Sequence, residues 1–155
     1  MRTRRPRPPR GRYLEHRTRL RVRFQEVDAL QIVWHGHFLS YFEQARVELG
    51  RQYGIHYNDI RRAGLSAPLV HVSCEFLSPA RFDEELEVTA RLYERESAKI
   101  EFHYEVRRVA DSELLAVGRS VQAFADPEGV LLLTMPPFMQ QFYERWRERM
   151  REDHE

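Results

Sequence analysis

Five segments of the chain alternate apolar and polar residues with a period of two, which is the pattern of strands that are buried on one face. In the first segment, Leu20, Val22 and Phe24 alternate with arginines. The five segments are residues 18–25, 70–76, 86–92, 100–106 and 114–124. Turn-forming pairs such as Ser78-Pro79 separate the last four segments, and links this short predict antiparallel pairing.

Between the first two strands, the apolar period changes to that of an amphipathic helix. Residues 37–53 carry apolar side chains on one broad face, namely Phe38, Tyr41, Phe42, Ala45, Leu49 and Tyr53. Gly54 follows directly, as glycine often does at the C-terminal end of a helix. Such a broad apolar face predicts a helix that is largely covered by other structure.

Two shorter helical segments complete the pattern. Residues 56–63 form a helical or irregular stretch, and Pro136 and Pro137 open a final helix that runs to about Met150. Its apolar stripe consists of Phe138, Phe142 and Trp146. The order of strand, long helix, four strands and helix predicts an α+β fold, in which one antiparallel sheet packs against one long helix.

The 155 residues suffice for one domain with one core. We place that domain at residues 17–150, with an arm at 1–16 and a tail at 151–155. Residues 1–12 carry six arginines and almost no apolar side chains, so we expect a disordered arm. The chain has 25 basic residues, and the 19 outside this stretch are outnumbered by 24 acidic residues. The positive charge is therefore confined to the arm, and we do not expect nucleic acid as a partner.

The sequence contains no segment that predicts export or membrane insertion. No apolar run approaches the roughly 18 to 20 residues that span a bilayer, and no apolar stretch follows the charged N-terminus as in a secretory signal. Cys74 is the single cysteine, and its alternation with apolar neighbours predicts a core position and not a nucleophile. We therefore expect a cytoplasmic protein.

A carboxylate and a helix start lie close together between the first strand and the long helix. Asp28 follows the strand, an apolar loop follows Asp28, and Gly36 lies at the start of the helix. A helix start leaves free backbone N–H groups and the positive end of the helix dipole, which can stabilise an oxyanion. A nearby carboxylate can attack a carbonyl or activate a water molecule. An aspartate before a helix can equally be a cap, so the residues alone leave both roles open.

Several runs of residues around Asp28 and the long helix form a signature. They are Asp28 with Ile32-Val33-Trp34-His35-Gly36, the helical run Tyr41-Phe42-Glu43-Gln44-Ala45-Arg46, and the later segments Tyr53-Gly54-Ile55 and 78–86. Together they resemble the 4-hydroxybenzoyl-CoA thioesterase family over about residues 18–145. The signature is specific for the family and poorly specific for the substrate.

The resemblance implies a hotdog fold, in which an antiparallel sheet wraps around the long helix, and homodimers or homotetramers with active sites at subunit interfaces. It implies hydrolysis of an acyl-CoA thioester without a cofactor or metal. Asp28 matches the catalytic carboxylate, as nucleophile or general base, and the backbone N–H of His35 matches the oxyanion donor. The residues that the resemblance implies in substrate contact are Trp34, Gly36, His37 and Phe38.

The resemblance also marks residues 95–99, a turn at which members of the family often meet the CoA phosphates. Arg95 and Lys99 could supply positive charges there, although an ordinary solvated hairpin explains them equally well. The chain departs from the family pattern at Gln31, where glycine is common, which puts the course of the loop in question. It departs again at His37-Phe38, where Asn-Tyr is common, which puts the details of substrate contact in question.

Other polar residues near the site have simpler explanations. His35 and His37 form a His-x-His pair, but no matching cluster of cysteines or acids accompanies it, so we expect no metal. Glu43 is a second candidate base, because another hotdog group carries its carboxylate on the central helix. Its spacing of three residues from Arg46 favours a structural ion pair instead.

The sequence leaves three other functions open: a hotdog dehydratase, a thioesterase that acts on acyl carrier protein, and a non-catalytic acyl-CoA-binding protein. The position of Asp28 before the helix favours a thioesterase over a dehydratase. Nothing in the sequence indicates whether the acyl group is aromatic, short or long.

Overall fold

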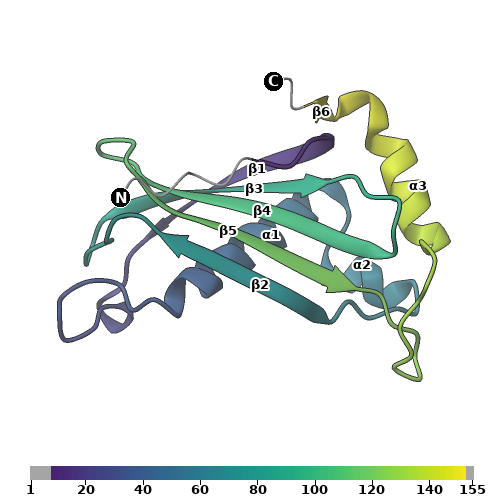
Figure 1. Cartoon of the computed structure of the whole chain (residues 1–155), viewed down its shortest axis with the longest axis horizontal. Coiled ribbons are helices and arrows are strands. Elements are labelled where there is room, and N and C mark those ends of the chain that lie inside the picture. Colours follow the sequence, from purple (N-terminus) through teal and green to yellow (C-terminus); the bar gives the residue numbers. More distant parts are fainter. Residues whose placement is uncertain (1–7, 153–155) are drawn as a thin grey trace.

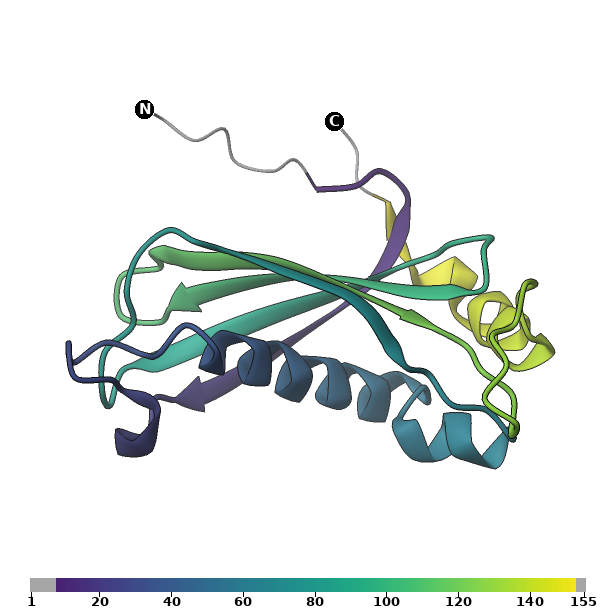
Figure 2. The same cartoon turned by 60° about the horizontal axis from the view of Figure 1, so that its bottom comes forward.

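The computed structural model describes residues 8–152 of the chain. An antiparallel sheet with the strand order β2-β5-β4-β3-β1-β6 curls around the helix α1, which packs against one face (Figure 1, Figure 2). The strands are β1 (Arg12–Arg21), β2 (Leu69–Phe76), β3 (Glu85–Tyr93), β4 (Lys99–Arg108), β5 (Leu114–Ala123) and β6 (Arg151–Glu152), and the α-helices are α1 (His37–Tyr53), α2 (Tyr57–Arg62) and α3 (Pro137–Trp146). The predicted α+β fold, with its sheet wrapped around a central helix, is confirmed.

Aromatic packing holds α1 against the sheet. Phe42 stacks on Tyr104 of β4, with ring centroids 4.5 Å apart. On the next strand, a Cβ on Gly118 would lie 2.3 Å from the Phe42 ring, so only glycine lets the helix approach β5 this closely. The predicted helix over residues 37–53 is confirmed, and Gly54 ends it with a φ of 80° in the left-handed region.

The first strand begins earlier than its alternating pattern suggests. Strand β1 runs over Arg12–Arg21 and not over 18–25, so residues 12–16 are strand and not disordered arm. Tyr13 in this part contacts Tyr93 of β3, with ring centroids 5.3 Å apart. The pairing with β3 extends the strand into arginine-rich sequence, which carries little apolar signal of its own.

The C-terminal tail is shorter than predicted. Residues Arg151–Glu152 form β6, which pairs with the first two residues of β1, so the predicted tail at 151–155 begins as a strand. The parts of the predicted arm and tail at residues 1–7 and 153–155 lie outside the described residues.

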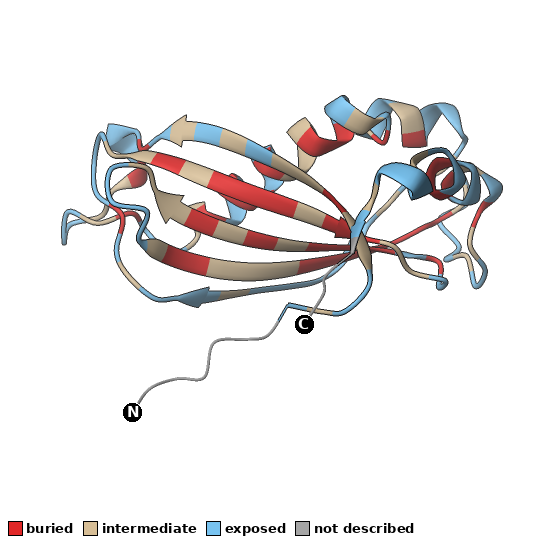
Figure 3. Ribbon diagram, turned by 90° about the horizontal axis from the view of Figure 1, so that it is seen from above, coloured by how far each residue is buried: buried red, intermediate tan, exposed pale blue. Residues whose placement is uncertain are grey.

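Strand β2 is an edge strand and is far more exposed than the predicted half-buried strand (Figure 3). The helix α1 packs mainly under β1 and β3 and contacts β2 through Phe38 and Phe76, so much of β2 lacks a cover on that face. Its exposed apolar side chains are those of Leu69, Val70, Val72 and Phe76. Cys74 is half-buried against the core; burial beside Glu75 raises the pKa of its thiol to about 12, so the thiol stays protonated.

The last helix, α3, ends at Trp146, four residues before the predicted end. The predicted stripe is only partly right, because Met139 and Tyr143 are buried beside Phe142, whereas Trp146 is only partly buried. The Nε1–H of Trp146 donates to the carbonyl of Tyr53 at 2.9 Å and ties α3 to the C-terminal end of α1. No helix within residues 8–152 is long and apolar enough to cross a membrane.

Candidate active site

Residues 22–36 connect β1 to α1 and form a folded loop at one end of the molecule (Figure 2). The loop doubles back on itself, because the Trp34 N–H donates to the Glu26 carbonyl at 2.9 Å. The Val33 N–H donates to the carbonyl of Ala80 at 2.8 Å, which attaches the loop to the segment after β2. The loop therefore lies between the start of α1 and the C-terminal end of the exposed edge strand.

The carboxylate of Asp28 is held by one of its two oxygens. Its Oδ1 accepts the N–H of Leu30 at 2.8 Å, which forms an Asx turn. Among residues 8–152, Oδ2 has no hydrogen-bond donor. The N-cap of α1 is Gly36, which has no side chain, so Asp28 caps its own loop and not the helix. One carboxylate oxygen is thus oriented by the loop while the other is available.

Gln31 adopts the backbone conformation that a glycine would favour. Its φ is 64°, in the left-handed region, and its N–H donates to the Asp28 carbonyl at 2.9 Å. A side chain in this region costs about 1 kcal/mol or more relative to glycine. The glutamine therefore does not remove the tight turn at Asp28; it places mild strain there.

The first turn of α1 leaves two backbone donors unused. The N–H groups of His37, Phe38 and Leu39 each donate to the carbonyl three residues earlier. The N–H groups of His35 and Gly36 have no acceptor within the described part of the chain. They lie at the positive end of a 17-residue helix, so they are the groups that can hydrogen-bond a carbonyl oxygen placed there.

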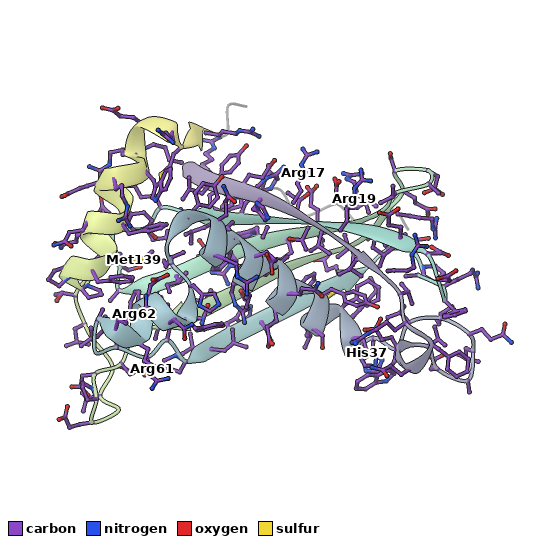
Figure 4. The ribbon with its side chains drawn as sticks, turned by 180° about the vertical axis from the view of Figure 1, so that it is seen from behind. Arg17, Arg19, His37, Arg61, Arg62 and Met139 are labelled. Atoms are coloured by element: carbon purple, nitrogen blue, oxygen red, sulfur yellow. The ribbon has the colours of Figure 1, made fainter. Side chains whose placement is uncertain are left out.

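The indole of Trp34 requires a glycine at position 36. A Cβ on Gly36 would lie 2.1 Å from the indole ring. Trp34 is 48% exposed, and its ring centroid is 4.8 Å from that of His35 and 5.6 Å from that of His37. The predicted substrate contacts Trp34 and His37 therefore form one aromatic surface with His35 beside the free donors, at the end of the molecule marked by His37 in Figure 4.

The fourth predicted substrate contact, Phe38, is buried and acts through packing. Its ring lies 5.7 Å from Tyr41 and 5.4 Å from Phe76 of β2, and Phe76 also faces the ring of His35 at 6.3 Å. Sequence reasoning did not single out Phe76, because nothing in an alternating strand shows which end meets the loop. The site therefore borders the exposed edge strand.

Glu26 is a second residue that sequence reasoning missed. It is only 3% exposed, and its Oε1 accepts the Arg23 N–H at 2.8 Å and the Tyr41 hydroxyl at 3.0 Å. Burial alone would raise the pKa of Glu26, but these hydrogen bonds and the Arg23 guanidinium lower it below its ordinary value. No sequence signal marks its burial, because Phe24 stands at the same alternating position and is 78% exposed.

The predicted ion pair between Glu43 and Arg46 is wrong. Glu43 is exposed and has no ion pair within residues 8–152, whereas Arg46 donates to the hydroxyls of Tyr57 at 3.1 Å and Tyr104 at 3.3 Å. Arg46 lies one turn after Phe42, on the side of α1 that faces β4, so it turns toward the sheet and away from Glu43.

Arg95 and Lys99 lie at the other end of the sheet from Asp28. Strand β3 starts near the loop and leads away from it. Its nine residues span about 26 Å, and the turn at 95–99 follows its far end. Arg95 is ion-paired with Glu101, and Lys99 is exposed. A single chain does not bring these residues to Asp28, and their contact with CoA stays a prediction that requires a second subunit.

Comparison with known proteins supports the family to which the motif points. Residues 22–143 match the family model described as the thioesterase-like superfamily. The chain belongs to this superfamily. Its sheet wrapped around a central helix is the hotdog fold of solved thioesterase structures.

Solved structures of the superfamily share the fold. A hypothetical protein, TT1821, from Thermus thermophilus is 30% identical, with a TM-score of 0.74 over 83% of this chain and 97% of its own. Slr0204, a 1,4-dihydroxy-2-naphthoyl-CoA thioesterase from Synechocystis, has the same TM-score at 21% identity, over 83% of this chain and 94% of its own.

Sequence comparison also finds a named relative. The acyl-CoA thioester hydrolase YbgC of Escherichia coli O6:H1 is 22% identical over 94 residues, which are 61% of this chain and 68% of that protein.

Proposed function

We propose that the protein hydrolyses an acyl-CoA thioester to a free acid and CoA, with Asp28 as nucleophile or general base and the His35 N–H as the oxyanion donor. The observation that carries this proposal is the loop 22–36, which holds a carboxylate with one available oxygen and ends at an uncapped helix N-terminus. Membership of the superfamily supports thioester chemistry, and the name of the Escherichia coli relative supports acyl-CoA as the substrate class.

The chemistry requires a nucleophile and a group that stabilises negative charge on the carbonyl oxygen. As general base, Asp28 takes a proton from water as the water oxygen adds to the carbonyl carbon; the C–S bond then breaks and the proton passes to the CoA thiolate. As nucleophile, Asp28 adds to the carbonyl carbon, the C–S bond breaks and CoA leaves as its thiolate, which forms an acyl-Asp28 anhydride; water then cleaves the anhydride, regenerates the Asp28 carboxylate as the free acid leaves, and supplies the proton that the thiolate takes up. In both routes the N–H of His35, with that of Gly36 beside it, stabilises the oxyanion at the positive end of α1.

The site needs a cover that one chain does not supply. Leu30 is 77% exposed and Trp34 is also exposed, yet oxyanion stabilisation is strongest where water is excluded. The adjacent strand β2 has an open, largely apolar edge of eight residues, which is a template for pairing with another strand. We therefore propose that a second copy of this chain pairs along β2, forms a homodimer and completes each site from across the interface.

The dimer is tested by the mass of the protein in solution, measured by light scattering after size exclusion. Val72→Lys places a charge on the face of β2 that is aligned with the core, and we expect monomers with weak activity. His71→Lys is the matched control, because His71 directly precedes Val72 on the same strand and faces the other side of the sheet. A wild-type monomer, or a Val72→Lys variant that stays dimeric and active, would contradict the proposal.

The activity is tested by thiol release from a panel of aromatic, short-chain and long-chain acyl-CoAs. Release with one acyl class preferred would support the proposal and name the substrate class. Binding of these esters without release would favour a non-catalytic acyl-CoA-binding protein. Release only from acyl carrier protein thioesters would replace CoA by the carrier protein as the substrate.

A further inference from the structure

The buried carboxylate of Glu26 has more hydrogen-bond partners than its place in a surface loop requires. Besides the Arg23 N–H and the Tyr41 hydroxyl on Oε1, its Oε2 accepts the guanidinium of Arg23 at 3.2 and 3.3 Å. Removing a carboxylate from water is costly, and an apolar side chain in such a position is often as stabilising or more so. The Glu26 carboxylate has no part in the steps of the proposed reaction, so its presence at a buried position needs another explanation.

Glu26 joins three parts of the site. Asp28 follows it by two residues along the chain. The carbonyl of Glu26 accepts the N–H of Trp34, the residue directly before His35. Its carboxylate accepts the hydroxyl of Tyr41, which is only 2% exposed and lies in the second turn of α1. The segment that carries the carboxylate, the segment that carries the oxyanion donor and the helix are therefore all attached to one residue.

We propose that Glu26, acting through Tyr41, is a positioning residue that sets the Asp28 carboxylate relative to the backbone N–H of His35. This inference rests on the proposed function, since it assigns a task within that reaction. Glu26 does not touch the substrate. It stays ionised because its pKa lies below its ordinary value, and a fixed charge on a rigid partner holds the loop better than a neutral contact does. A misplacement of about 1 Å between reacting groups can cost about 100-fold in rate.

Tyr41→Phe removes only the hydroxyl of this contact and leaves the ring in the core. We expect kcat to fall about 10-fold or more while KM changes less than about threefold, because the loop still binds substrate but aligns it poorly. Tyr53→Phe is the matched control on the same helix: it removes a hydroxyl that donates to the Glu15 carbonyl at the far end of α1. We expect its kcat to equal that of the wild type. Equal kcat values for the two variants would overturn the inference.

Two further measurements separate positioning from mere stability. Glu26→Gln and Tyr41→Phe act through one contact, so the double variant is expected to lose little more kcat than Glu26→Gln alone. Additive losses would overturn the inference. Hydrogen exchange of the amides of Val33 and Trp34, which donate to the carbonyls of Ala80 and Glu26, should accelerate in Tyr41→Phe and not in Tyr53→Phe, and this readout requires no turnover.

The exchange measurement also separates this inference from the proposed function. A wild type that releases no thiol from any ester refutes the proposed function. Unchanged exchange over the loop in Tyr41→Phe refutes the positioning role, whether or not the wild type is active. An active wild type with faster exchange and lower kcat in Tyr41→Phe alone is the result that the inference expects.

Discussion

The two ends of α1 differ in how their terminal backbone groups are hydrogen-bonded. At its C-terminal end, the N–H groups of Gly54 and Ile55 both donate to the Gly50 carbonyl at 2.9 Å, and the Trp146 indole donates to the Tyr53 carbonyl. At its N-terminal end, the N–H groups of His35 and Gly36 have no acceptor in residues 8–152, and no side chain caps the helix. One end is closed by the chain itself, whereas the other presents its dipole and two donors to a ligand.

This contrast separates stability from function along a single helix. The closed end is packed against α3, and α2 with Arg61 and Arg62 lies near it in Figure 4. The open end carries an exposed indole and two histidines, and the loop that leads into it carries the Asp28 carboxylate. We therefore expect substitutions at the open end to lower turnover and those at the closed end to lower the free energy of unfolding alone.

Among substitutions in α1 and at its two caps, the largest effect is expected for Gly36→Ala at the open end. Its methyl group would lie 2.1 Å from the indole, so Trp34 or the first turn of α1 has to move. Because the oxyanion donors lie in this turn, we expect kcat/KM to fall about 100-fold, within the range for loss of an oxyanion donor. Steady-state thiol release checks this, and turnover within threefold of the wild type would contradict the assignment of this end.

Gly54→Ala is the matched substitution at the closed end. Gly54 has a φ of 80°, so a side chain there costs about 1 kcal/mol of folding free energy. We expect a lower melting temperature and an unchanged kcat/KM at a temperature where the variant is folded. A loss of turnover as large as that of Gly36→Ala would remove the distinction between the two ends.

Low pH should lower the free energy of unfolding, because it protonates Glu26 near the open end. The folded-state pKa of Glu26 lies below its ordinary value of 4.5, so the unfolded state binds more protons in this range. Its contribution to stability is therefore complete above about pH 4.5 and is lost as the pH falls through the folded pKa. Denaturant unfolding of Glu26→Gln should show a weaker pH dependence below pH 4.5 than the wild type does.

The smallest effect is expected for Gln31→Gly. The substitution relieves the strain of a left-handed glutamine but adds backbone freedom to the unfolded chain, and the two terms nearly cancel. We expect the free energy of unfolding to change by less than about 1 kcal/mol and kcat to stay within twofold. A large gain or loss of turnover would show that the Gln31 side chain itself takes part in the site.

The core of the fold was predictable from sequence because its signals are local. The 3.6-residue period over residues 37–53 and the glycine after it predict α1 residue for residue. The alternating segments predict β3, β4 and β5 closely. The exposure of β2 was not predictable, because an exposed apolar edge strand has the same pattern as a strand covered by its own chain. The start of β1 was missed because the strand is specified by its pairing with β3.

The residues of the site were predictable only where they belong to a motif that resembles the family. The roles of Asp28 and His35 came from the resemblance and stay predictions, although the structure leaves the His35 N–H free, as that role requires. Spacing alone suggested the wrong partner for Arg46, since two residues three apart on a helix can turn to different neighbours. The contacts of Glu26 join residues 15 positions apart, and no local pattern reports such a distance.

The most direct test of the central claim is thiol release from acyl-CoA by the wild type, Asp28→Asn and Asp83→Asn. Asp83 is the matched control, because it is an exposed aspartate in the left-handed region, where asparagine is readily tolerated. We predict that Asp28→Asn loses at least about 1,000-fold in kcat with its melting temperature unchanged, since the amide is a poor base and nucleophile. Asp83→Asn should match the wild type. An Asp28→Asn variant that retains turnover within about tenfold of the wild type would contradict the assignment of Asp28 as the catalytic carboxylate.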